Sequence, residues 1–119
     1  MNLNLLDSYG FEVTSGLARC LDDRELYERL LELFMEDDTF PKAFEYFEKD
    51  ETQELFELMH ALKGACGNVA MNELYGALVP LVDLLRKKEG EKDDIFVLLS
   101  KVEKLYNRAK EGITQAGKE

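Results

Sequence analysis

Apolar residues recur at intervals of three and four along most of this chain, which is the spacing of helices buried on one side. The pattern predicts helices over residues 12–20, 51–69 and 72–89, and a last helix that opens near Asp93. Residues 22–49 fit one bent helical arm, and two separate helices fit the same pattern equally well. No segment alternates apolar and polar positions between turn signals, so we expect no β-sheet.

Two of these helices have apolar faces that we expect to point into the core. On the helix over residues 51–69 the stripe consists of Leu55, Leu58, Met59, Leu62, Ala65, Cys66 and Val69. In the first half of the arm the inward residues are predicted to be Leu26, Leu30, Leu33 and Phe34.

Helix boundaries are marked by capping and stop residues. Asp22 followed by Glu25 has the spacing of a capping box, and Asp50 followed by Gln53 repeats it ahead of residues 51–69. Gly90 is expected to stop the helix over residues 72–89.

Four long helical elements joined by short loops predict an all-α fold, an up-down antiparallel four-helix bundle with a short extra N-terminal helix. We interpret residues 1–119 as a single domain. Residues 1–10 are expected to be a loose lead-in and residues 117–119 a frayed tail.

The chain is acidic, with 25 Asp and Glu against 15 Lys and Arg and a net charge of −10. This charge argues against nucleic acid or an anionic membrane as a partner. No apolar run is long enough to span a bilayer and no signal peptide is evident, so we expect a cytoplasmic location. We also expect a monomer. Cys20 and Cys66 form no disulfide framework and are expected to be reduced, partly buried thiols.

The strongest candidate for chemistry is His60, the only histidine of the chain. At about 100° per residue it projects opposite the apolar stripe, and Gly64 and Gly67 fall on the same outward face. Lys63 stands one turn further on, where its ammonium group can swing back over the ring. An accessible imidazole beside a cation suits a group that accepts a phosphoryl, whereas the alternatives are a surface histidine without a task and, for the glycines, close helix packing. A metal site is not expected, because there is no second histidine and no cysteine pair.

Residues around His60 are candidates for docking a partner. Phe56 and Ala61 flank the histidine, with Phe56 either partly buried or part of an apolar docking patch. Glu57 and Asn68 are expected at the rim. Arg86 either joins this surface or caps its own helix, and we favour the cap.

Residues 60–64 read His-Ala-Leu-Lys-Gly, and this stretch resembles the His-x-Leu-Lys-Gly core of histidine phosphotransfer (HPt) domains. The similarity extends from about Gly16 to Arg86 and so covers most of the chain. One departure is Ala70, at a place where members of the family often have glycine.

The resemblance implies a phosphocarrier without autonomous turnover rather than an enzyme. His60 would accept a phosphoryl group from a phosphoaspartate of a response-regulator receiver domain and pass it to an aspartate of another. Lys63 would offset the phosphoryl charge and Gly64 would give steric clearance. No cofactor is expected on this chain, because the receiver would supply Mg²⁺; a hybrid histidine kinase is a further candidate partner. Transfer should weaken on acidification, since a protonated imidazole cannot attack.

An alternative function from another class is a helical adaptor or inhibitor. Such a protein would bind a receiver or a kinase without carrying phosphate.

Overall fold

A computed structural model describes residues 1–118, and within this range the chain forms helices and no strands. The helices are η1 (Leu3–Tyr9), α1 (Val13–Arg19), α2 (Arg24–Glu36), α3 (Lys42–Glu48), α4 (Thr52–Asn68), α5 (Asn72–Lys87) and α6 (Lys92–Gly117). The predicted all-α class is confirmed.

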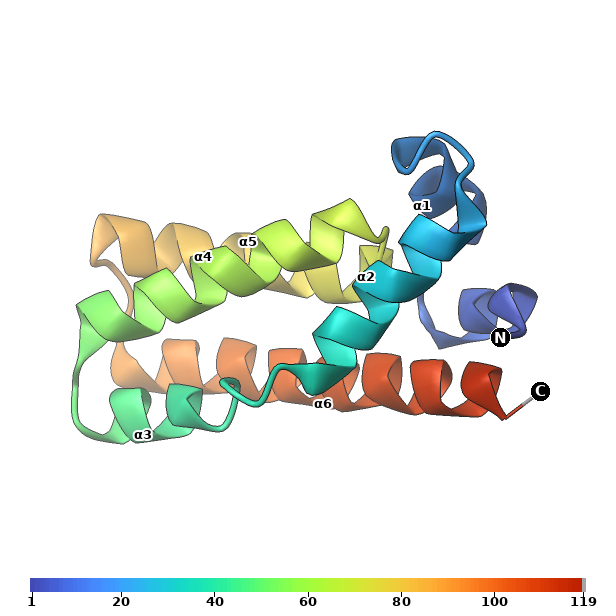
Figure 1. Cartoon of the computed structure of the whole chain (residues 1–119). Coiled ribbons are helices and arrows are strands. Elements are labelled where there is room, and N and C mark those ends of the chain that lie inside the picture. Colours follow the sequence, from blue (N-terminus) through green and yellow to red (C-terminus); the bar gives the residue numbers. More distant parts are fainter. Residues whose placement is uncertain (119) are drawn as a thin grey trace.

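Three long helices form the body of the bundle. α4 and α5 run antiparallel side by side, and α6 passes beneath them with α3 next to it (Figure 1). α2 crosses this body obliquely and leads into α3 (Figure 1). The arm over residues 22–49 is therefore two helices, separated by residues without helical structure from Asp37 to Pro41.

The core follows the predicted stripe of α4 closely. Buried side chains from this helix and its C-cap are Leu55, Met59, Leu62, Cys66 and Val69. Two predicted members differ, because Leu58 is only half-buried and Ala65 is exposed.

The inward face of α2 was predicted correctly at Phe34 and in part at the half-buried Leu30, but wrongly at Leu26 and Leu33. Tyr27, Leu31 and Phe34 are buried, whereas Leu26 and Leu33 are each 45% exposed. The physical reason lies in Tyr27, whose hydroxyl donates a hydrogen bond of 2.9 Å to the carbonyl oxygen of Val69. This bond turns the tyrosine side of α2 toward the end of α4.

Several helix ends also differ from prediction. The cap of α2 is Asp23, which accepts from the amide of Leu26 at 3.1 Å, while Asp22 adopts a left-handed conformation with φ 60°. Asp50 likewise has φ 56° and pairs with Lys92 at 3.0 Å, so it does not cap α4. At the end of α5 the left-handed residue is Lys88, with φ 55°, two positions before the predicted stop at Gly90.

The ends of the chain depart from the expectation of loose segments. Residues 3–9 form η1, which buries Leu3 and Leu6 and packs against α6. The helix α6 continues through Gly117, and Lys118 is its exposed C-cap. Of the predicted frayed tail, Glu119 lies outside the described residues.

The turn between α4 and α5 contains Ala70, which has φ 57°. This left-handed conformation favours glycine, the residue that the resembled family often has at this place. The buried alanine adopts it here because its carbonyl accepts from the amide of Glu12 at 2.9 Å and its amide donates to Gly67 at 3.3 Å.

Candidate functional site

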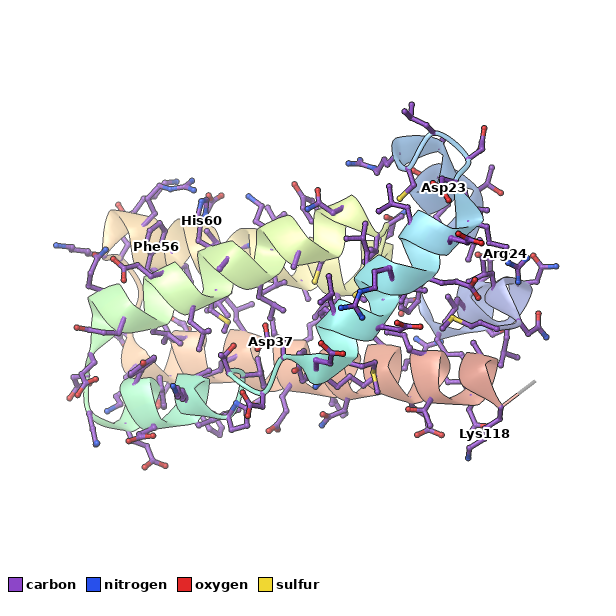
Figure 2. The ribbon with its side chains drawn as sticks, viewed as in Figure 1. Asp23, Arg24, Asp37, Phe56, His60 and Lys118 are labelled. Atoms are coloured by element: carbon purple, nitrogen blue, oxygen red, sulfur yellow. The ribbon has the colours of Figure 1, made fainter. Side chains whose placement is uncertain are left out.

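His60 lies halfway along α4 with its side chain exposed. Its neighbours Met59 and Leu62 are buried, and this phase of the helix turns the imidazole away from the core. In Figure 2, His60 and Phe56 project together from the edge of α4 that faces away from α3 and α6. The outward placement predicted from the spacing is therefore observed.

The imidazole is stacked on an aromatic ring. The ring centroids of Phe56 and His60 are 5.6 Å apart and their planes differ by 16°. Phe56 is half-buried and packs against the core, which agrees with partial burial, while its place in a docking patch stays a prediction. The guanidinium carbon of Arg86 lies 5.7 Å from the Phe56 centroid, and Arg86 also pairs with Asp83 at 3.4 Å. Arg86 thus joins the surface of His60, contrary to the predicted role as a cap alone.

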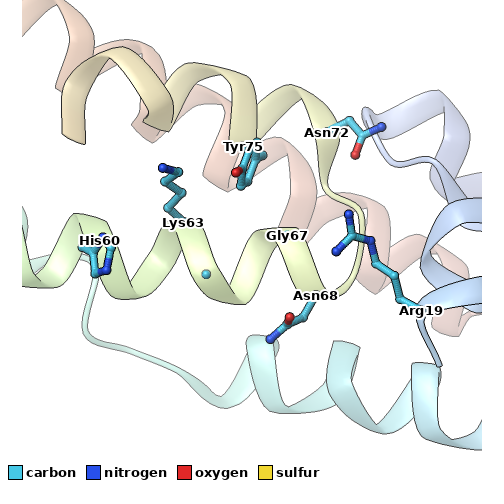
Figure 3. A pocket seen from close by; sticks show the side chains of 8 residues that line it. Arg19, His60, Lys63, Gly67, Asn68, Asn72 and Tyr75 are labelled. Carbon is cyan, nitrogen blue, oxygen red and sulfur yellow. The ribbon is translucent and has the colours of Figure 1, made fainter. Parts of the chain in front are cut away.

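Lys63 is oriented differently from the prediction. Its ammonium nitrogen lies 5.7 Å from the ring centroid of Tyr75 on α5, not over the imidazole. A cation–π contact with an aromatic ring holds it there. Figure 3 shows the Lys63 side chain rising toward α5, one helical turn from His60. To meet a group attached to His60, the side chain would have to leave Tyr75 by rotation.

The two glycines of α4 have different surroundings. A Cβ atom built on Gly64 would find no atom within 4 Å, so the surface beside His60 is open as predicted. A Cβ on Gly67 would lie 3.4 Å from a ring carbon of Tyr75. Gly67 is half-buried, and the alternative of close helix packing describes it better than open clearance does.

These residues line a groove of about 420 Å³ between α4, α5 and the end of α1 (Figure 3). Its lining residues are Arg19, His60, Lys63, Gly64, Gly67, Asn68, Asn72 and Tyr75. The groove contains two cationic side chains, Arg19 and Lys63, so it can receive an anionic group.

The structure brings only some of the predicted docking residues to this groove. Asn68 lines it, but the carboxylate of Glu57 accepts a hydrogen bond from Gln53 at 3.2 Å on the helix surface. Ala61 lines a separate hollow that also includes Leu58.

Sequence reasoning missed three lining residues, Arg19, Asn72 and Tyr75. The sequence contained a weak signal for Asn72 and Tyr75. Both lie on the first turn of α5, which runs antiparallel to α4, so polar residues there must lie near the end of α4. Nothing in the spacing linked Arg19 to His60.

The thiols of the chain have no part in this site. Cys20 and Cys66 are buried and unlinked. Burial raises the pKa of Cys66 to about 12, which makes the thiol a poor nucleophile.

Two further kinds of site were sought within residues 1–118. No group of three His, Cys, Asp or Glu side chains is placed to hold a metal ion there. In that range there is also no helix with the length and apolar character needed to cross a bilayer.

In comparisons with known proteins, the Hpt domain family matches residues 17–112, which is most of the chain. Neither curated proteins nor solved structures gave a match. Hpt domains are phosphocarriers in two-component signalling rather than enzymes in the usual sense, and they interact with receiver domains. The match includes α4 and the groove, so the chain belongs to the Hpt domain family.

Proposed function

We propose that this protein carries a phosphoryl group on His60, which it accepts from a receiver-domain phosphoaspartate and passes to an aspartate of a second receiver. The observation that carries the proposal is the exposed imidazole beside the open surface of Gly64. A receiver can approach the ring there without meeting a side chain of α4.

The chemistry requires a neutral imidazole. The lone pair of Nε2 attacks phosphorus, an N–P bond forms and the P–O bond to the aspartyl carboxylate breaks. The aspartate leaves as a carboxylate, and the proton on Nδ1 stays on the ring. The second transfer reverses these steps on another aspartate. In-line phosphoryl transfer depends chiefly on positioning and charge stabilisation, so the imidazole must be held in one orientation.

Each neighbour of His60 has a distinct task in this proposal. Phe56 holds the plane of the imidazole through the stacked contact. Lys63 leaves Tyr75 and offsets the charge of the phosphoryl group. Gly64 admits the partner, while the receiver supplies Mg²⁺ and the rest of the charge clamp.

The proposal extends to the setting of this chemistry. We place the protein in the cytoplasm as a monomer, with a hybrid histidine kinase as a further partner. The α2–α3 arm would act as the first member of an up-down four-helix arrangement with α4, α5 and α6.

The test is phosphotransfer from receiver domains charged with a small phosphodonor, with the natural protein and His60→Gln compared. The expected result is an acid-labile, alkali-stable label on the natural protein only. Binding of the same receivers without any label on His60 would favour the adaptor function instead. Label that persists in His60→Gln would contradict the assignment of the site.

A further inference from the structure

Arg19 differs from the other arginines of the chain. Within residues 1–118 it makes no ion pair and no hydrogen bond from its side chain, although the chain is rich in acidic residues. The other four arginines each pair with a carboxylate, and they are Arg24, Arg29, Arg86 and Arg108. Figure 3 shows the Arg19 side chain extended from the end of α1 into the groove.

No acidic side chain lines the groove, and the carboxylate of Glu12 at its edge accepts a hydrogen bond of 2.7 Å from Asn72. None of its eight lining residues is Asp or Glu, although 25 of the 119 residues of the chain are acidic. Arg19 and Lys63 therefore form a local cationic surface on a molecule of net charge −10. Such a surface attracts an anionic group of a partner, whereas the acidic remainder of the molecule repels it.

Arg19 lies at the end of the groove opposite His60. It reaches the end of the groove where Asn68 and Asn72 lie, and Lys63 stands between it and His60 (Figure 3). Asn68 lies eight positions after His60, so at 1.5 Å per residue the two positions are about 12 Å apart along α4. The guanidinium is thus available to a second anionic group.

We infer that Arg19 is a docking residue, whose guanidinium binds a carboxylate on the surface of the receiver domain that seats over His60. This inference rests on the proposed function for the identity of the partner. The guanidinium presents a planar fork of donors that matches a carboxylate. Arg19 takes no part in the chemical step, because the reacting atoms are at the other end of the groove.

The experiment is a binding titration of an unphosphorylated receiver domain against the natural protein, Arg19→Gln, Arg19→Glu and the matched control Lys104→Glu. Lys104 is exposed on α6, a helix that contributes nothing to the groove, and its reversal changes the net charge by the same amount. Rates of transfer at saturating receiver are measured on the same samples. Thermal melts establish that each variant is folded.

We expect Arg19→Glu to weaken receiver binding by about fivefold or more at low salt and Arg19→Gln by less, because glutamine only removes the attraction to the receiver carboxylate whereas glutamate also repels it. The loss should shrink as salt is added. Lys104→Glu should bind within about twofold of the natural protein. The transfer rate at saturation should be unchanged in all variants.

Equal weakening by Arg19→Glu and Lys104→Glu would show an effect of net charge only and would overturn the inference. Unchanged binding by both Arg19 variants would overturn it as well. The binding titration uses no phosphate, so its result is independent of phosphotransfer. Binding that depends on Arg19, together with transfer assays that leave no label on His60, would support the docking role and contradict the proposed function.

Discussion

The imidazole of His60 lies nearly parallel to the ring of Phe56, with 5.6 Å between the ring centroids. The two residues are one helical turn apart on α4, a spacing at which side chains meet on one face. Because Arg86 from α5 lies over the same phenyl ring, two helices contribute to the surface that orients the imidazole.

The first prediction concerns this stack. Phe56→Leu should lower the rate of phosphotransfer to His60 several-fold, because the imidazole loses the flat surface that fixes its plane. The fold should persist, since leucine keeps most of the apolar contact with the core. Phe96→Leu is the matched control, because Phe96 is a half-exposed phenylalanine on α6. Equal rates for the natural protein and Phe56→Leu would contradict the orienting role.

A second prediction separates stability from function at Gly64. Gly64→Ala should raise the free energy of unfolding by about 0.5–1 kcal/mol, because an added methyl group meets nothing and glycine is unfavourable within a helix. The same variant should slow transfer, since its methyl group occupies the approach to His60. Gly76→Ala on α5 is the control, with equally open surroundings and no place in the groove. Denaturant unfolding and transfer kinetics measure the two effects, and similar transfer by both variants would contradict the clearance role.

At Gly16, in contrast to Gly64, a change to alanine should lower the stability of the protein. A Cβ atom there would lie 2.6 Å from a ring carbon of Tyr27. The Tyr27 side chain is fully buried, and its hydroxyl donates a hydrogen bond to the carbonyl oxygen of Val69. Gly16→Ala should therefore destabilise the protein by about 1–3 kcal/mol, as overpacking of a core does. Chemical denaturation measures the unfolding midpoints of Gly16→Ala and of the control Gly76→Ala. A midpoint that does not fall would mean that α1 can shift away from α2 at little cost.

Alkaline pH provides a further test through Cys66, whose pKa burial raises to about 12. The unfolded thiol ionises above about pH 8.5, whereas the folded thiol stays protonated. The contribution of Cys66 to stability is thus constant at lower pH and declines as pH rises toward 12. Each pH unit in that interval should cost about 1.4 kcal/mol from this group. Urea unfolding from pH 7 to 11 should show a shallower decline for Cys66→Ala, and parallel curves would contradict the assignment.

The fold could be predicted from the sequence wherever one helix face was unambiguous. α4 has a single apolar stripe, and its buried residues were identified almost completely. α2 offers two stripes with the same spacing of four and then three residues: one consists of Leu26, Leu30 and Leu33, and the other of Tyr27, Leu31 and Phe34. Tertiary contacts bury the second stripe, because Gly16 makes room for the Tyr27 ring and the carbonyl oxygen of Val69 accepts a hydrogen bond from the Tyr27 hydroxyl.

The candidate site could likewise be predicted only where its residues lie on one helix. His60, Lys63 and Gly64 share one helix, so their common face follows from helical geometry alone. The orientation of Lys63 depends on Tyr75 of another helix, and local spacing could not predict it. Arg19 comes from α1, and only the packing of that helix brings it to the groove.

The amide of Asn2 donates to the carbonyl of Ala116 at 2.8 Å, and a Cβ atom on Gly112 would lie 2.7 Å from Tyr9. Chain ends usually exchange their amide hydrogens first, because they fray independently of the core. Here η1 and the last turns of α6 cover each other, so neither can open without exposing the other. The two ends should therefore exchange at one common rate, as a single cooperative unit made from the segments most distant in sequence.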